Sequence, residues 1–237
     1  MSSERRRTQV EFDLVEHTRI RQAIGDRTLQ SVNEIPQFRV QKMVLAHNLV
    51  AFRAHLKQSD ADPLPTYNDI LIKLTATVLA RFPRLNAWHS PEGLQQLREV
   101  NIGLAVDTEQ GVLLPTVRDA DTKSLAEIAA TTRELVSLAR SGKLRASLQM
   151  GAGFTLSNIG PIGIDLFDAI ISPPQTGILA VGSILPRPVA DDGQVIVRDT
   201  MWLSLTIDHR SVDGADGARF VAELAQTIEQ MSPGQSL

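Results

Sequence analysis

The segment 206–217, with the sequence TIDHRSVDGADG, constrains the fold of this chain more than any other stretch. The β-branched and apolar residues at 202–207 are typical of a strand, and the spacing of apolar residues over 220–228 predicts a helix. Between them, Gly214 and Gly217 predict a tight turn. The sequence therefore predicts a strand and a helix joined by a short connection that carries a histidine.

His209 is a candidate general base at the end of that predicted strand. An imidazole can exchange a proton near neutral pH, and a nearby carboxylate such as Asp213 can orient the ring or the loop around it. A histidine and an aspartate at this spacing also occur without any catalytic role. The motif alone is therefore equally consistent with a structural histidine.

The rest of the chain predicts a mixed α/β fold without internal repeats. Ser124 followed by Glu127 forms a capping box at the start of one helix, and residues 191–194 (DDGQ) predict a hairpin turn. The apolar patterns predict helices at 19–33, 45–58, 68–82 and 124–141, and strands at 38–43, 100–106 and 112–117. We expect helices on one side of a large mixed sheet.

Length and composition exclude several classes of protein. A chain of 237 residues is within the range of one large domain. Without cysteine it has no disulfide, thiolate nucleophile or cysteine metal site, which fits a reducing compartment. We expect a cytoplasmic protein, and no metal is needed for its stability. A formal net charge of -3 gives no basic field for nucleic acid. No apolar run reaches the roughly 18 residues of a membrane span, and the N-terminus lacks the apolar centre of a signal peptide.

The sequence DHRSVDG resembles the active-site signature of the catalytic domain of dihydrolipoamide acyltransferases, the core enzymes of 2-oxo acid dehydrogenase complexes. This domain is similar to chloramphenicol acetyltransferase. The resemblance implies an α/β two-layer sandwich, a mixed β-sheet covered by helices. Collinear matches over most of residues 19–228 are far more specific than the histidine motif alone. Four further segments match in order: 19–38 (RIRQAIGDRTLQSVNEIPQF), 68–87 (NDILIKLTATVLARFPRLNA), 101–129 (NIGLAVDTEQGVLLPTVRDADTKSLAEIA) and 154–184 (FTLSNIGPIGIDLFDAIISPPQTGILAVGSI).

The resemblance also implies roles for individual residues. His209 would act as the base that makes an attacking thiolate, and Ser157 in FTLSN would donate a hydrogen bond to the oxyanion of the tetrahedral intermediate. Apart from the family, Ser157 is a strand-end serine that caps backbone. Asp213 would either assist the histidine or, as we prefer, hold its loop through an ion pair with Arg21. Arg19 and Arg27 are alternative partners at that helix start.

Two further kinds of residue complete the predicted site. Asp208 is expected to be a buried acid with a structural role, because buried acids are rarely left unpaired. Relatives contact coenzyme A at positions that match Arg53, Thr66, Asp107 and Gly182. Arg53 is equally well interpreted as a solvated charge. No phosphate-binding loop of the GxGxxG or GxxxxGK type is present, so the sequence gives no support for nucleotide hydrolysis.

Three departures from the family lead to further expectations. We expect residues 1–15 to form a flexible arm and 16–237 the catalytic domain, with no lipoyl or peripheral-subunit-binding domain. The acyl group would then arrive on the lipoyl or phosphopantetheine arm of a partner, either a lipoyl domain or an acyl carrier protein, downstream of a thiamine-dependent 2-oxo acid decarboxylase. The segment KLRASLQMGAG before FTLSN differs from relatives. The polar end EQMSPGQSL predicts a free tail and an assembly that stops at a homotrimer.

The predicted function is therefore transfer of an acyl group between thiols, from a lipoamide or carrier-protein thioester to coenzyme A, in a 2-oxo acid dehydrogenase-like system. A non-catalytic scaffold or binding protein of the same fold is the alternative. A serine hydrolase that uses Ser157, His209 and Asp213 is less favoured, because no GxSxG elbow surrounds the serine.

Overall fold

A seven-stranded mixed sheet forms one layer of the structure, a computed structural model that describes residues 11–59, 62–191 and 193–237. The strands follow the order β1-β11-β9-β8-β4-β7, and β10 pairs with β11. β8 is parallel to both β4 and β9, and the other pairs are antiparallel. The strands are β1 (Gln37–Leu45), β4 (Ile102–Leu104), β7 (Thr116–Val117), β8 (Phe154–Asn158), β9 (Gly177–Val181), β10 (Leu185–Asp191) and β11 (Gln194–Asp208).

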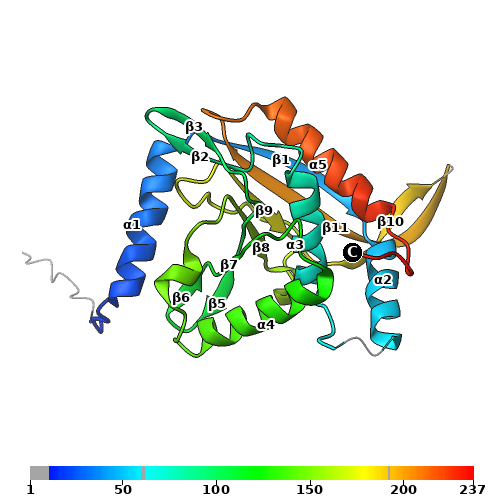
Figure 1. The fold of residues 1–237 in the computed structure, drawn as a ribbon, viewed down its shortest axis with the longest axis horizontal. Coiled ribbons are helices and arrows are strands. Elements are labelled where there is room, and N and C mark those ends of the chain that lie inside the picture. Colours follow the sequence, from blue (N-terminus) through cyan, green and yellow to red (C-terminus); the bar gives the residue numbers. More distant parts are fainter. Residues whose placement is uncertain (1–10, 60–61, 192) are drawn as a thin grey trace, which may run out of the picture.

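Two short hairpins and a ribbon extend from this sheet. β2 (Ala87–Ser90) pairs with β3 (Gly93–Gln96), and β5 (Val106–Thr108) pairs with β6 (Gly111–Leu113). The β10–β11 ribbon projects from the body of the molecule (Figure 1). The hairpin turn predicted at 191–194 includes residue 192, which lies outside the described residues, but the register pairs Asp191 with Gln194.

The helices begin where side chains satisfy the free N–H groups of the first turn. Thr18 caps α1, and capping boxes start α3, with Thr66 and Asp69, and α4, with Ser124 and Glu127 as predicted. The helices are α1 (Arg19–Glu34), α2 (His47–Gln58), α3 (Tyr67–Leu79), α4 (Leu125–Arg140) and α5 (Gly214–Glu229), with short 3₁₀ turns η1 (Ala146–Gln149) and η2 (Gly160–Ile162). The predicted start of the second helix at Leu45 is wrong, because Leu45 pairs with Thr200 as the last residue of β1.

The core lies between the sheet and the helical layer. In Figure 1, α5 runs along β1 and β11; α3 packs against α5, and α4 packs against α3. Phe220 of α5 contacts Phe154 of β8, with ring centroids 5.7 Å apart, and Phe82 after α3, at 5.4 Å. Phe154 and Phe220 are fully buried and connect the two layers. The predicted two-layer α/β sandwich is confirmed.

Gly214 and Gly217 form part of α5, so the tight turn predicted there is wrong. A Cβ at position 214 would lie 3.0 Å from the ring of Phe38 on β1, whereas one at position 217 would make ordinary contacts of 3.4 Å with Ile207 and Leu205 of β11. The absence of a side chain at position 214 therefore lets the first turn of α5 approach the Phe38 ring closely. The glycine signal reflects helix–sheet packing and not a chain reversal.

The predicted free C-terminal tail is also wrong. Met231 is buried, and Leu237 packs against the hydrophobic core. The N–H of Leu125 donates to the carbonyl oxygen of Leu237 at 3.1 Å, so the tail lies against the start of α4. Two apolar residues of this mostly polar segment thus pack against the core.

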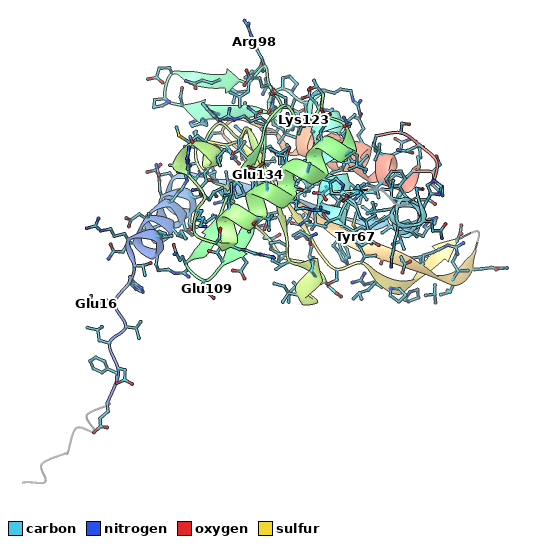
Figure 2. All side chains as sticks on the ribbon, turned by 60° about the horizontal axis from the view of Figure 1, so that its bottom comes forward. Glu16, Tyr67, Arg98, Glu109, Lys123 and Glu134 are labelled. Atoms are coloured by element: carbon cyan, nitrogen blue, oxygen red, sulfur yellow. The ribbon has the colours of Figure 1, made fainter. Side chains whose placement is uncertain are left out.

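At the other end of the chain, residues 11–18 form no helix or strand. Glu16 lies on a segment that extends away from the body (Figure 2), and Phe12 and Val15 are both 82% exposed. The predicted arm at 1–15 is only partly described, since residues 1–10 lie outside the described residues. Among the helices of the described part, none has the length and apolar character needed to cross a membrane.

Candidate active site

His209 is the first residue after β11 and its side chain is exposed. Its backbone N–H donates to the carbonyl oxygen of Pro36 at 3.1 Å, and its ring meets the edge of Phe38 with centroids 5.3 Å apart. The main chain of the histidine is therefore fixed to the start of β1. The imidazole is left accessible to a molecule that approaches this end of the sheet.

The next turn of the chain is held by a second histidine. Ser211 and Val212 donate their N–H groups to the carbonyl oxygen of Asp208, and the Ser211 hydroxyl lies 2.8 Å from Nδ1 of His89. His89 belongs to β2, where its own N–H donates to Pro174. This contact anchors the histidine loop to a hairpin far away in sequence. No sequence pattern around His89 indicates that it contacts Ser211.

Asp208 is fully buried, as predicted, and its partner is Arg210. Arg210 donates from Nη2 to Oδ2 at 2.7 Å, from Nε to Oδ1 at 2.9 Å and from its backbone N–H to Oδ1 at 3.0 Å. These hydrogen bonds to the carboxylate raise the pKa of Arg210 above its ordinary value. The arginine of the DHR sequence thus neutralises the buried acid on the other side of His209.

Replacing Arg210 by alanine is expected to lower the free energy of unfolding by about 2–3 kcal/mol, because it leaves a buried carboxylate unpaired. The effect should fall below the roughly 3–5 kcal/mol of a fully buried pair, since the side chain of Arg210 is 35% exposed. Urea denaturation of the variant measures this. Arg219→Ala, which breaks an exposed ion pair with Asp216, should change stability by less than about 1 kcal/mol.

Asp213 is the N-cap residue of α5, and the predicted ion pair with Arg21 does not form within the described chain. Arg21 instead lies against Gly111 of the β5–β6 hairpin, and Arg27 donates to Ser172 and Pro173. Arg19 also forms no ion pair with Asp213 in the residues described. The exposed carboxylate lies at a helix N-terminus, where the helix dipole favours negative charge.

Ser157 lies near the end of β8, half-buried, and lines a cavity of about 340 Å³ between α1 and the sheet. In the sheet register Ser157 is opposite Ala180 of β9, and Ala180 is opposite Ser204 of β11. His209 comes five positions after Ser204 and two strands away from Ser157. At ordinary strand dimensions the two residues are roughly 20 Å apart, too far to contact one thioester.

A larger cavity of about 860 Å³ lies between α3, α4 and the ends of β8 and β9. Arg53, Thr66 and Gly182 line it, and Asp107 does not, since it is exposed on the β5–β6 hairpin. The guanidinium of Arg53 stacks over the ring of Tyr67 at 5.2 Å, and its buried Nε has no hydrogen-bond partner among the described residues. Arg53 is therefore not the ordinary solvated charge of the alternative interpretation.

Thr66 and Gly182 shape this cavity through the backbone. The hydroxyl of Thr66 donates to Asp69 at 2.8 Å and accepts from its N–H, so it is used in capping α3. A Cβ at Gly182 would lie 1.8 Å from the carbonyl oxygen of Asp165. Only glycine permits this close approach of two chain segments at the wall of the cavity.

Sequence reasoning missed two cations of the large cavity. Arg133 and Arg140 line it together with Val136 and Ser137. Their spacing along α4 places all four side chains on one helical face. The signal was present in that spacing, but it could not be recognised without knowing that this face borders a cavity.

Comparison with known proteins agrees with this architecture. The family described as 2-oxoacid dehydrogenases acyltransferase (catalytic domain) matches residues 9–234. The dihydrolipoyllysine-residue acetyltransferase component of the pyruvate dehydrogenase complex of Rickettsia felis is 34% identical over 222 residues, 92% of this chain and 54% of that protein. The chain thus spans about half the length of this curated relative.

Solved structures extend the comparison. Dihydrolipoamide acetyltransferase of Azotobacter vinelandii, studied for the roles of a serine, a histidine and an asparagine in its catalytic mechanism, is 34% identical with a TM-score of 0.88; the match covers 93% of this chain and 92% of that one. The cubic core of the pyruvate dehydrogenase multienzyme complex gives the same values. Chloramphenicol acetyltransferase, at 13% identity and a TM-score of 0.51, covers 92% of this chain and 97% of its own and shares the fold.

The family match spans almost the whole chain. This chain belongs to the family of 2-oxoacid dehydrogenase acyltransferase catalytic domains.

Proposed function

We propose that this chain transfers an acyl group between two thiols, at a site composed of His209 from one copy and Ser157 from a neighbouring copy. One observation carries the proposal. Ser157, His209 and Asp213 have the same sequence intervals as the serine, histidine and asparagine studied in the Azotobacter enzyme. Their separation of roughly 20 Å within one chain supports a site shared between copies.

The chemistry needs a base and an oxyanion donor. A neutral imidazole of His209 accepts the proton of the attacking thiol, and the thiolate adds to the thioester carbonyl. The Ser157 hydroxyl donates a hydrogen bond to the oxyanion. Collapse of the intermediate breaks the original carbon–sulfur bond, and the leaving thiolate takes the proton back from the imidazolium. A scaffold has no need of all three residues, which disfavours the non-catalytic alternative.

The large cavity is the proposed site for coenzyme A. Arg53, Arg133 and Arg140 line it, and guanidinium groups match phosphate geometry. Gly182 forms its wall, and Asn158 on the strand that carries Ser157 borders it. Asp107 lies outside this cavity and remains a proposed contact of coenzyme A. No metal takes part in the proposed chemistry.

Arg53→Gln should raise KM for coenzyme A by about 10-fold or more and change kcat little, because a charge-assisted hydrogen bond contributes about 1.5–3 kcal/mol. Steady-state kinetics at varied coenzyme A concentration measures this. Arg98→Gln is the matched control, because Arg98 is exposed and Figure 2 shows it projecting away from Tyr67. An unchanged KM in the Arg53 variant would contradict the placement of coenzyme A.

The acyl donor is proposed to be a swinging arm, on a lipoyl domain or an acyl carrier protein, charged by a thiamine-dependent 2-oxo acid decarboxylase. Residues 16–237 would form the catalytic domain that receives it. The relatives named above are components of pyruvate dehydrogenase complexes, which supports the lipoyl route. We keep the cytoplasm as the proposed location, because a chain without cysteine needs no oxidising compartment.

The deciding experiment incubates the protein with an acyl-CoA and dihydrolipoamide. Thiol-to-thiol exchange supports the acyltransferase, release of free acid supports a hydrolase, and no reaction supports a scaffold. Offering acyl-lipoyl domain, acyl-CoA and holo acyl carrier protein in pairs, with intact-mass detection, then identifies the carrier. Exchange with small dithiols alone would contradict a protein carrier.

The proposed assembly is a homotrimer, because closed symmetry is the norm and a site shared between copies needs a neighbour. Light scattering checks the assembly. A monomer contradicts the shared site, and a particle of the size of the cubic core contradicts an assembly that stops at the trimer.

A further inference from the structure

The smaller cavity, of about 340 Å³, has an apolar wall immediately beside Ser157. It lies between α1 and the parallel strands, on the side of β8 opposite to the large cavity: Ser157 borders one cavity and its neighbour Asn158 borders the other. Most of the side chains that line it are apolar, namely Ile24, Ala105, Val112, Leu114, Phe167, Ala169, Ile170, Ile171 and Ile178.

The charged groups of this wall already have partners. Arg27 donates to Ser172 Oγ at 3.3 Å and to the carbonyl oxygen of Pro173. Asp168 pairs with Arg39 at 3.1 Å and accepts from Gln41 at 2.8 Å and from Ser204 at 2.7 Å. The cavity therefore offers no free charge to a polar ligand.

Two hydroxyl groups of the wall remain available. In the part of the chain that the structure describes, neither Ser157 nor Thr28 forms a side-chain hydrogen bond. Thr28 lies on α1, and Ser157 lies on β8, so one available donor belongs to each wall. The hydroxyl of Ser157 can thus bind a carbonyl oxygen at the edge of an otherwise apolar space.

Hydrogen bonds fix the position of α1 relative to the 171–173 segment of the cavity wall. The Ser31 hydroxyl donates to the carbonyl oxygen of Ile171 at 2.6 Å, and both residues are buried. With Arg27, this contact fixes the 171–173 segment to α1. These contacts fix one wall of the cavity to α1.

The volume exceeds what an acetyl group needs. Beyond its carbonyl an acetyl group has one methyl, which is comparable to the roughly 30 Å³ share of one water in the liquid. The cavity is about ten times larger. It leaves room for several further methylene or methyl groups next to Ser157.

We propose that this cavity binds the hydrocarbon part of the acyl group and that the chain prefers linear or branched acyl groups of about four to six carbons to acetyl. This inference rests on the proposed acyltransferase function. Burying each added methylene should raise kcat/KM by about fourfold, so valeryl should exceed acetyl by about 50-fold. The donors that carry such groups are thioesters derived from branched-chain or longer aliphatic 2-oxo acids.

The test measures kcat/KM for acetyl-, propionyl-, butyryl-, valeryl- and isovaleryl-CoA with dihydrolipoamide as the constant acceptor. The same series is measured for Thr28→Phe, which adds a ring to the cavity wall without removing a hydrogen bond. We expect the valeryl-to-acetyl ratio to fall at least 10-fold in this variant. Leu29→Phe, at an exposed neighbour on α1 that does not line the cavity, should keep the wild-type ratio.

The outcomes separate the two proposals. No transfer from any thioester contradicts the proposed function itself. Transfer with acetyl equal to or above valeryl contradicts the acyl-chain pocket alone. An equal loss of acetyl and valeryl transfer in Thr28→Phe would assign the cavity to the carrier arm and also overturn the inference.

Discussion

Replacing His209 by alanine is expected to reduce kcat for acyl exchange by about 100- to 10,000-fold, the usual contribution of a general base. The side chain is exposed and its fixed position depends on a backbone hydrogen bond to Pro36, which alanine retains. The variant should therefore keep its fold and its assembly. The exchange assay with acyl-CoA and dihydrolipoamide measures the loss of activity. Circular dichroism checks the fold, and light scattering checks the assembly.

His55→Ala is the matched control for this result. His55 is exposed on α2, and no side-chain hydrogen bond involves it among the described residues. Its removal should leave kcat within about twofold of wild type, as for most surface substitutions. Near-normal turnover in purified His209→Ala would show that another group removes the thiol proton.

Mixing two inactive variants should restore activity if the site is shared between copies. Ser157→Ala should lose about 100-fold or more in kcat as one oxyanion donor is removed. In trimers formed from equal amounts of Ser157→Ala and His209→Ala chains, each interface has an intact histidine and an intact serine in about one case in four. Co-expressed and co-purified mixtures should then recover about a quarter of wild-type activity.

The control mixes each variant with itself under the same conditions. Recovery in the mixed sample, without recovery in either control, requires residues from two chains. A mixture that stays as inactive as its parents, although mass spectrometry shows mixed trimers, would mean that His209 and Ser157 of the same chain act together. That result would contradict the separation of roughly 20 Å derived from the sheet register.

The features predicted correctly from the sequence depend on contacts between residues close in the chain. The capping box of Ser124 and Glu127 and the strand before His209 are examples. Both the three-residue spacing of the capping box and the run of β-branched and apolar residues in the strand are visible in a short window of sequence. Asp208 was predicted as a buried structural acid, and its partner Arg210 is only two positions away. The family resemblance supplied the remaining site candidates, whose roles stay predictions.

Errors arose where a local signal had two physical causes. Glycine permits a turn, but it also permits close helix packing, and the close approach of Gly214 to the Phe38 ring is an example of the second. The tail residues 231–237 are mostly polar, yet Met231 and Leu237 pack against the core, and Leu237 also accepts a hydrogen bond from Leu125. The expected ion pair between Arg21 and Asp213 fails within the chain because α1 directs Arg21 toward Gly111.

The sequence by itself determined the family, the order of the main helices and strands and the residues that carry the proposed chemistry. Only the tertiary structure decided that Ser157 and His209 lie far apart in one chain, and that β8 separates a cationic cavity from an apolar one. The physical reason is that helices and caps form through neighbours in sequence, whereas register, cavities and shared sites depend on residues far apart in the chain, such as Gln37 and Asp208, which pair across β1 and β11.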